Sequence, residues 1–315
     1  MSTRTATSLG DLETSAASDS ERELPPAIHA EAGYLEVRGV GGLGYYRDVA
    51  GSNPAIVLIH SINAAASAYE MRPLFEAFRG RRRVFALDLP GFGRSQRGDR
   101  EYRPALYADA IERFIVDVAS PQGDPVDAVA LSLSSEFLAR VGLRAPELFR
   151  SLTLLSPTGL GPARPGGRLV RGALDKALGV GAISSGLFRA LRSEASIRHY
   201  LKKSFAGSID EGLARYAVKT SAVPGARFAP VSFLRGALFT PDAARSLYEP
   251  LKVPTRVVFD QDPYTRFDKL EELTRSNPRV SAHRVAPSLG MPQFDRTNEV
   301  VSLIEQPGSG AGAIP

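Results

Sequence analysis

Three short segments bring together residue types that could support nucleophilic chemistry. In residues 58–63 and in residues 88–95, the end of an apolar run leads into a turn that contains small residues. In residues 129–135, Ser132 stands where a predicted strand turns sharply into a helix. A serine hydroxyl becomes an effective nucleophile when a neighbouring base accepts its proton. His60 is one of only four histidines in the chain, so few side chains could serve as that base.

The elements that would position these segments alternate between strands and helices. The continuous apolar run at residues 55–60 is typical of a strand buried on both faces, and helical spacing of apolar residues follows it. This alternation predicts an α/β fold with a mostly parallel sheet flanked by helices. The expected strands are 34–40, 43–48, 55–60, 83–88, 126–131, 151–155, 255–260 and 280–285, and the main helices are 67–78, 107–119, 134–145 and 297–305.

Composition narrows the classes of function. The chain of 315 residues has no cysteine, which excludes a disulfide framework, thiolate zinc sites and iron–sulfur clusters. We expect no metal and no cofactor. Residues 1–30 and 307–315 contain few large apolar residues and are expected to be disordered tails. No signal-peptide pattern and no long apolar run is present, so we expect a cytoplasmic protein.

The three segments together resemble the α/β-hydrolase family over roughly residues 34–305. The most specific local match is the Asp-x-Pro-Gly-x-Gly-x-Ser pattern of residues 88–95, and Ser132 stands where the family has its nucleophile. The family elbow reads Gly-x-Ser-x-Gly, because small residues relieve crowding at the bend. Here Ala130 and Ser134, the next smallest residues, take the glycine positions.

This resemblance implies the α/β-hydrolase fold with a helical cap. The core would comprise residues 31–157 and 251–306, with the cap formed by residues 158–250. The resemblance also implies a catalytic acid after the strand at 255–260. Asp262, directly before a proline, is the expected acid, and Asp260 is the alternative.

Backbone N–H groups would stabilise the oxyanion that forms when the serine attacks. Leu133, directly after the serine, would supply one donor. The turn after His60 would supply the second donor, from Ile62 or Ser61, and Asn63 could add a side-chain donor.

The expected base is missing from its usual place. The family carries a histidine in a Gly-His-x-Pro turn after the last strand, whereas residues 289–295 read Leu-Gly-Met-Pro-Gln-Phe-Asp and align Gly290 with that histidine. Glycine cannot accept a proton. His60 is therefore the expected substitute near Ser132, since His283 falls inside a predicted strand.

Two functions remain open at this stage. The first is hydrolysis of an ester, thioester, amide or activated C–C bond of a small apolar substrate by a serine with an incomplete triad. The second is a non-catalytic protein of the same fold that binds a small ligand or a protein partner. The retained serine, acid and turns favour the first, and the missing histidine favours the second.

The predicted cap has an uneven charge. Residues 158–250 contain fourteen Lys and Arg against six Asp and Glu, a net charge of +8. A basic cap could bind an anionic partner or a membrane surface. No helix-turn-helix, RNA-binding or zinc pattern accompanies the charge, so nucleic acid is not an expected partner.

Overall fold

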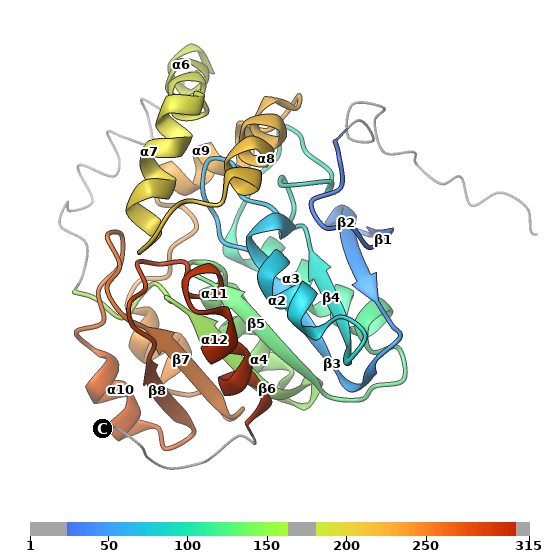
Figure 1. The fold of residues 1–315 in the computed structure, drawn as a ribbon, viewed down its shortest axis with the longest axis vertical. Coiled ribbons are helices and arrows are strands. Elements are labelled where there is room, and N and C mark those ends of the chain that lie inside the picture. Colours follow the sequence, from blue (N-terminus) through green and yellow to red (C-terminus); the bar gives the residue numbers. More distant parts are fainter. Residues whose placement is uncertain (1–23, 163–180, 307–315) are drawn as a thin grey trace, which may run out of the picture.

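The computed structural model describes residues 24–162 and 181–306 of the chain. Its strands are β1 (Glu31–Val37), β2 (Gly41–Asp48), β3 (Ser52–Ile59), β4 (Arg82–Leu87), β5 (Val126–Leu131), β6 (Phe149–Leu155), β7 (Thr255–Phe259) and β8 (Val280–Arg284). They form one eight-stranded sheet in the order β1-β2-β4-β3-β5-β6-β7-β8 (Figure 1). The β1/β2 and β2/β4 pairs are antiparallel and the other pairs are parallel. The predicted mostly parallel sheet is therefore confirmed.

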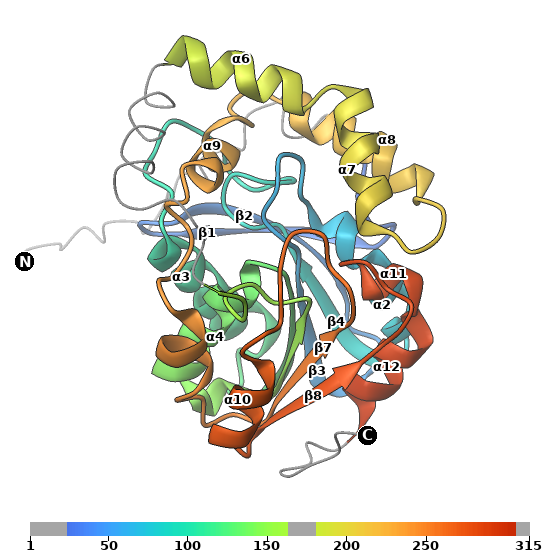
Figure 2. The same ribbon diagram turned by 90° about the vertical axis from the view of Figure 1, so that its left-hand side faces the viewer.

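Helices cover both faces of this sheet (Figure 2). One face carries α3 (Pro104–Phe114), α4 (Ser134–Arg144) and α10 (Leu270–Ser276). The other face carries α2 (Arg72–Phe78) and α12 (Thr297–Glu305). Two apolar cores, one under each helical layer, hold the sheet in place.

Successive residues of the central strands face opposite cores, as the two-residue repeat of a strand requires. In β3, Val57 and Ile59 belong to the core under α3 and α4, whereas Ile56 and Leu58 belong to the core under α2 and α12. All four side chains are fully buried. This double burial explains why the strand is an uninterrupted apolar run in the sequence.

The chain between β6 and β7 forms a helical cap over the carboxyl ends of the parallel strands (Figures 1 and 2). Its helices are α6 (Gly181–Leu191), α7 (Glu194–Ser204), α8 (Glu211–Ala222), α9 (Phe228–Leu234) and a short π-helix η4 (Ala244–Tyr248). Asp210 caps α8, because its side chain accepts a hydrogen bond from the Leu213 N–H at 2.6 Å. The part of the predicted cap at residues 163–180 lies outside the described residues.

The start of the described chain, residues 24–30, packs against the sheet. The Ala27 N–H donates to the hydroxyl of the fully buried Tyr46 at 3.0 Å. The prediction of a disordered tail was therefore wrong for these residues, because a short apolar segment finds a place in the core. The rest of the two predicted tails, residues 1–23 and 307–315, lies outside the described residues.

Two predicted helices are divided in the structure. The helix expected at 67–78 begins as a 3-10 helix, η1 (Ala68–Met71), and α2 follows it. Pro73 accounts for the break, since proline lacks an N–H and suits the first turn of a new helix. The helix expected at 107–119 is α3, which ends in a π-helix, η2 (Ile115–Ala119).

A buried carboxylate fixes the turn that follows β4. Asp88 is fully buried, and its side chain accepts hydrogen bonds from the N–H groups of Ala68 at 2.7 Å and Arg94 at 3.0 Å. Gly93 closes the turn with φ +51°, and a β-carbon there would lie 2.0 Å from the Asp88 carboxylate. This segment shapes the backbone beside the strand ends and supplies no reacting group.

Gly93→Ala is expected to destabilise the protein more than Gly80→Ala. Both glycines have positive φ, +51° and +71°, but a β-carbon at Gly80 meets no atom within 4 Å. Gly80→Ala should cost about 1 kcal/mol through the left-handed backbone alone. Gly93→Ala should cost about 2 kcal/mol more, because the buried carboxylate has no room to move. Urea denaturation measures both losses, and equal losses would contradict the steric role of this turn.

Candidate active site

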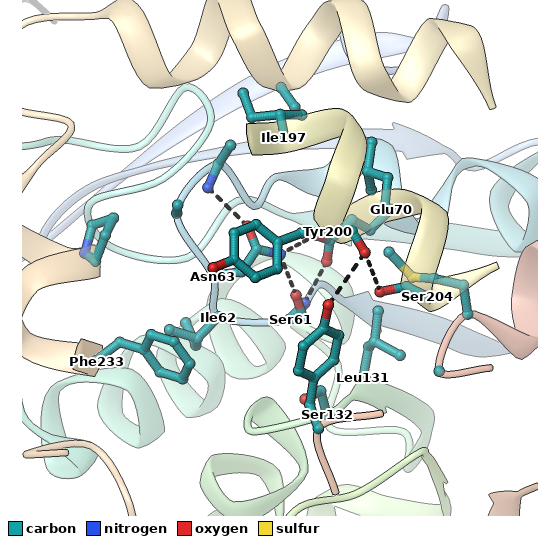
Figure 3. Close-up of a pocket in the computed structure, with 18 of the residues that line it drawn as sticks. Ser61, Ile62, Asn63, Glu70, Leu131, Ser132, Ile197, Tyr200, Ser204 and Phe233 are labelled. Carbon is teal, nitrogen blue, oxygen red and sulfur yellow. Dashed lines mark hydrogen bonds between the residues drawn. The ribbon is translucent and has the colours of Figure 1, made fainter. Parts of the chain in front are cut away.

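A cavity of about 370 Å³ lies between the cap and the carboxyl ends of the parallel strands. The turns after β3, β5, β7 and β8 form its core side, and α6 to α9 form its cap side. Most of the lining is apolar, with Ile197, Tyr200 and Phe233 on the cap side (Figure 3). The lining residues are Ser61, Ile62, Asn63, Ala64, Ala65, Glu70, Leu131, Ser132, Leu191, Ile197, Tyr200, Leu201, Ser204, Leu213, Ala217, Pro230, Phe233, Leu234, Asp262, Tyr264, Gly290 and Met291.

Ser132 lies in this cavity, on the turn from β5 to α4 (Figure 3). Its φ of +56° is in the left-handed region, which non-glycine residues rarely adopt. Its N–H donates to the Leu155 carbonyl at 2.8 Å, which holds the turn on β6. The small residues Ala130 and Ser134, which flank the bend, are both fully buried. The backbone therefore makes the sharp strand-to-helix turn that presents a serine hydroxyl.

Two backbone N–H groups at this end of the cavity have no acceptor among the described residues. One belongs to Leu133, directly after the serine, and the other to Ile62, in the turn after β3. Ile62 itself lines the cavity. N–H groups in this condition can donate to a ligand oxygen that carries developing negative charge.

The other predicted donors in that turn, Ser61 and Asn63, are already engaged (Figure 3). The Ser61 N–H donates to Glu70 Oε2 at 2.8 Å. The Asn63 amide donates to Glu70 Oε1 at 2.7 Å and to Ser61 Oγ at 2.9 Å. Because neither group is free, the geometry supports Ile62 and argues against Ser61 and Asn63 as oxyanion donors.

Glu70 also belongs to the site, although it was not among the residues predicted from the sequence. It lines the cavity, is only 2% exposed and accepts both of those hydrogen bonds. Burial raises the pKa of Glu70, and the hydrogen bonds from Ser61 and Asn63 oppose that rise. The available signal was that Glu70 is the only charged residue between His60 and Arg72. Its role here is to hold the turn that carries Ile62.

His60 is buried behind this turn and does not line the cavity. Its Nε2 accepts a hydrogen bond from the Leu89 N–H at 2.9 Å, so Nδ1 carries the proton and donates to the Ser61 carbonyl at 2.6 Å. Burial lowers the pKa of His60 to about 4, and the bond to Ser61 opposes that change only in part. The structure therefore argues against the prediction that His60 replaces the missing base, because both ring nitrogens already hold backbone groups.

Of the two predicted acids, Asp262 lines the cavity and Asp260 does not. Asp260 forms an ion pair with Arg284 Nε at 2.8 Å. Asp262 Oδ1 accepts hydrogen bonds from the N–H groups of Tyr264 at 2.7 Å and Thr265 at 3.1 Å. Burial raises the pKa of Asp262 to about 6 in spite of these two donors. The geometry thus favours Asp262 over Asp260.

Gly290 lies directly against Asp262. A β-carbon on Gly290 would lie 2.9 Å from Asp262 Oδ2, and the φ of +112° at Gly290 is one that other residues rarely adopt. None of the described residues that line the cavity is a histidine. His283 lies in β8, where its Nε2 is 2.9 Å from Ser281 Oγ.

The sequence matches the alpha/beta hydrolase family over residues 56–303, most of the chain. The protein belongs to the alpha/beta hydrolase family. A search among curated proteins found no match.

Solved structures of very different sequence share the fold of this α/β-hydrolase. A serine hydrolase involved in carbazole degradation is 17% identical, with a TM-score of 0.69 over 87% of this chain and 96% of its own. The thioesterase domain from the curacin biosynthetic pathway is 14% identical, with a TM-score of 0.67 over 88% of this chain and 99% of its own. A haloalkane dehalogenase loop variant from Bradyrhizobium elkanii is 15% identical, with a TM-score of 0.65 over 87% and 94% of the two chains.

Other kinds of site find little support in the described part of this α/β-hydrolase. No group of three His, Asp or Glu side chains there is arranged to hold a metal ion. None of the helices in residues 24–162 and 181–306 is long and apolar enough to cross a bilayer. The polar residues among the described cavity lining are Ser61, Asn63, Glu70, Ser132, Tyr200, Ser204, Asp262 and Tyr264.

Asp262→Asn is expected to stabilise the folded protein at neutral pH. Above about pH 6 the folded protein holds a carboxylate that the unfolded chain exposes to water, and a rise in pKa from 3.8 to about 6 corresponds to at most about 3 kcal/mol. Asparagine keeps an oxygen for the N–H groups of Tyr264 and Thr265 without the charge. The pKa of Asp262 is higher in the folded protein than in the unfolded chain. The wild-type protein therefore regains this stability as the pH falls from about 6 to about 4, and the stability advantage of the variant disappears over the same pH range.

Thermal denaturation across this pH range measures the effect. Asp260→Asn is the control of opposite sign, because the pKa of Asp260 is lowered by its hydrogen bonds to Arg284 and Ser288. It should lose stability at neutral pH. An Asp262→Asn variant that is less stable than wild type near pH 8 would contradict a desolvated carboxylate at this position.

Proposed function

We propose that this α/β-hydrolase binds an uncharged, largely apolar acyl compound and reacts with it through Ser132. The reaction class is attack of the serine Oγ on the carbonyl of an ester, thioester or amide, or on a carbonyl beside an activated C–C bond. The N–H groups of Ile62 and Leu133 receive the oxyanion, and Asp262 is the acid of the site.

One observation carries this proposal: the left-handed backbone of Ser132 inside the cavity. Such a conformation costs a non-glycine residue about 1–2 kcal/mol. Strain of this kind persists mainly at functional sites. A glycine would make the same turn without the cost, so the hydroxyl itself is the feature that the strain supports.

The charge of the cavity favours uncharged over anionic substrates. Glu70 and Asp262 line it, and none of the described lining residues is Lys, Arg or His. Basic side chains of the cap, such as Arg189, Lys202 and Lys203, are exposed instead. If the basic cap binds an anionic partner, as its composition predicts, it does so outside this cavity.

The same site predicts slow turnover. A serine triad without its base retains roughly 10³–10⁴-fold acceleration over water from oxyanion stabilisation and binding. We therefore expect acylation of Ser132 by reactive substrates and a slow return of the free enzyme.

A second function, ligand binding without chemistry, is favoured by the absence of a histidine from the described cavity lining. The two functions differ in whether a covalent bond forms at Ser132. Covalent labelling therefore separates them.

A fluorophosphonate probe is expected to label the wild-type protein once, at Ser132, over hours. The phosphonyl oxygen would lie against the free N–H groups of Ile62 and Leu133. Intact mass and peptide mapping measure the stoichiometry and the site. Ser132→Ala should not be labelled.

Ser204→Ala is the matched control, since Ser204 is a hydroxyl on the cap side of the same cavity. It should be labelled like wild type. A folded wild-type protein that stays unlabelled would overturn the nucleophile assignment and support ligand binding alone.

Uncharged ligands are expected to stabilise the protein more than anionic ones of the same length. Octanol and methyl octanoate should raise the melting temperature, and octanoate should raise it less, because its carboxylate meets Glu70 and Asp262 in an apolar setting. In Asp262→Asn, the difference in melting-temperature shift between methyl octanoate and octanoate should be smaller. Equal or stronger stabilisation by octanoate would contradict the charge argument.

A further inference from the structure

Asp262 has one carboxylate oxygen that is bonded and one that is not. Oδ1 accepts the hydrogen bonds from the N–H groups of Tyr264 and Thr265. Oδ2 accepts none from the described residues and lies beside Gly290, 2.9 Å from the place a β-carbon would occupy. Since Asp262 lines the cavity, this oxygen can accept a hydrogen bond from a ligand that brings an N–H group.

Asp262 differs in this respect from Glu70, the other carboxylate of the cavity. Both oxygens of Glu70 accept hydrogen bonds, from Ser61 and from Asn63. Its capacity is used within the protein. Of the two carboxylates in the described cavity lining, Asp262 is the one with an oxygen that accepts no hydrogen bond from the described residues.

The cavity has room for such a group next to the serine. Gly290 brings no side chain, and Asp262, Gly290 and Ser132 all line the same cavity of about 370 Å³. Apolar protein cavities smaller than this admit molecules of the size of benzene. An azole ring is no larger and fits the same space.

We propose that the region bounded by Asp262, Gly290 and Ser132 is a subsite for a nitrogen base carried by the ligand. The ligand would be an apolar ester, thioester or amide that carries an azole ring. One ring nitrogen donates its N–H to Asp262 Oδ2, which orients the ring and stabilises its protonated form, and the other, basic ring nitrogen accepts the serine proton. This inference rests on the proposed function, because it gives Ser132 a base in a cavity whose described lining residues include no histidine.

The ligand nitrogen carries the serine proton to the leaving group. As Ser132 Oγ bonds to the acyl carbon, its proton passes to the ligand nitrogen. The bond from the acyl carbon to the leaving group then breaks, and the leaving group departs with that proton. Asp262 only orients the nitrogen, so we regard it as a positioning residue.

Imidazole is the probe for this subsite. Adding imidazole should accelerate fluorophosphonate labelling of Ser132 about a hundredfold, with saturation at high concentration, as expected for a bound general base. Pyrazole, which has the same ring size and is a much weaker base, should not accelerate it. In Asp262→Asn the ratio of the rates with and without imidazole should fall at least about tenfold, since the amide would turn its NH₂ group toward the cavity.

Asp260→Asn is the matched control, because Asp260 lies on the same loop but does not line the cavity. It should keep the full imidazole effect. An acceleration that does not saturate and is equal in Asp262→Asn would overturn the proposal, since it would show catalysis by imidazole in solution.

A binding measurement separates this inference from the proposed function. Saturation-transfer NMR should detect imidazole bound to Ser132→Ala and should not detect it in the double variant that also carries Asp262→Asn. If imidazole binds in this way but Ser132 is never labelled, the subsite stands and the nucleophile assignment fails. If Ser132 is labelled but imidazole neither binds nor accelerates, the subsite fails and the nucleophile stands.

Discussion

The left-handed turn at Ser132 is the constraint on which the rest of the site depends. β5 ends at Leu131 and α4 begins at Ser134, so the chain reverses direction within two residues. The small, fully buried residues Ala130 and Ser134 flank that turn, which places the Ser132 hydroxyl and the Leu133 N–H on the same bend. The Ser134 hydroxyl also donates to the His60 carbonyl, which joins the elbow to the turn after β3. Ser132 and the turn that carries Ile62 are therefore held as one unit.

The buried polar groups around this unit differ in how much hydrogen-bonding capacity they have left. His60 uses both ring nitrogens to hold Leu89 and Ser61, and Glu70 uses both oxygens to hold Ser61 and Asn63. These groups stabilise backbone turns through the bonds that they form within the protein. Asp262 differs from them, because its Oδ2 accepts no hydrogen bond from the described residues while the residue lines the cavity. Residual capacity for a hydrogen bond separates a supporting residue from one that can meet a ligand.

The sequence predicted the fold well because the fold depends on periodic patterns. Apolar runs such as β5 report burial on both faces, and a serine at the strand–helix junction indicates the elbow. Hydrogen-bond partners depend instead on residues that tertiary packing brings together. The Leu89 N–H is 29 residues from His60, and Glu70 holds Ser61 from a separate helical turn, so neither role was visible in the local pattern. Sequence alone therefore placed His60 near Ser132 without revealing that its nitrogens were committed.

The backbone conformation of Gly290 and its contact with Asp262 both favour glycine at this position. Its φ of +112° is unfavourable for any other residue, and a β-carbon there would press on Asp262 Oδ2 at 2.9 Å. A histidine at this position would require the backbone to leave that conformation and the carboxylate to move at the same time. Asp262, however, is fixed by two backbone N–H groups, so such a movement would also break those bonds. The turn is thus built for glycine, and a base that reaches Ser132 at this side of the cavity is more easily brought by a ligand than restored by one substitution.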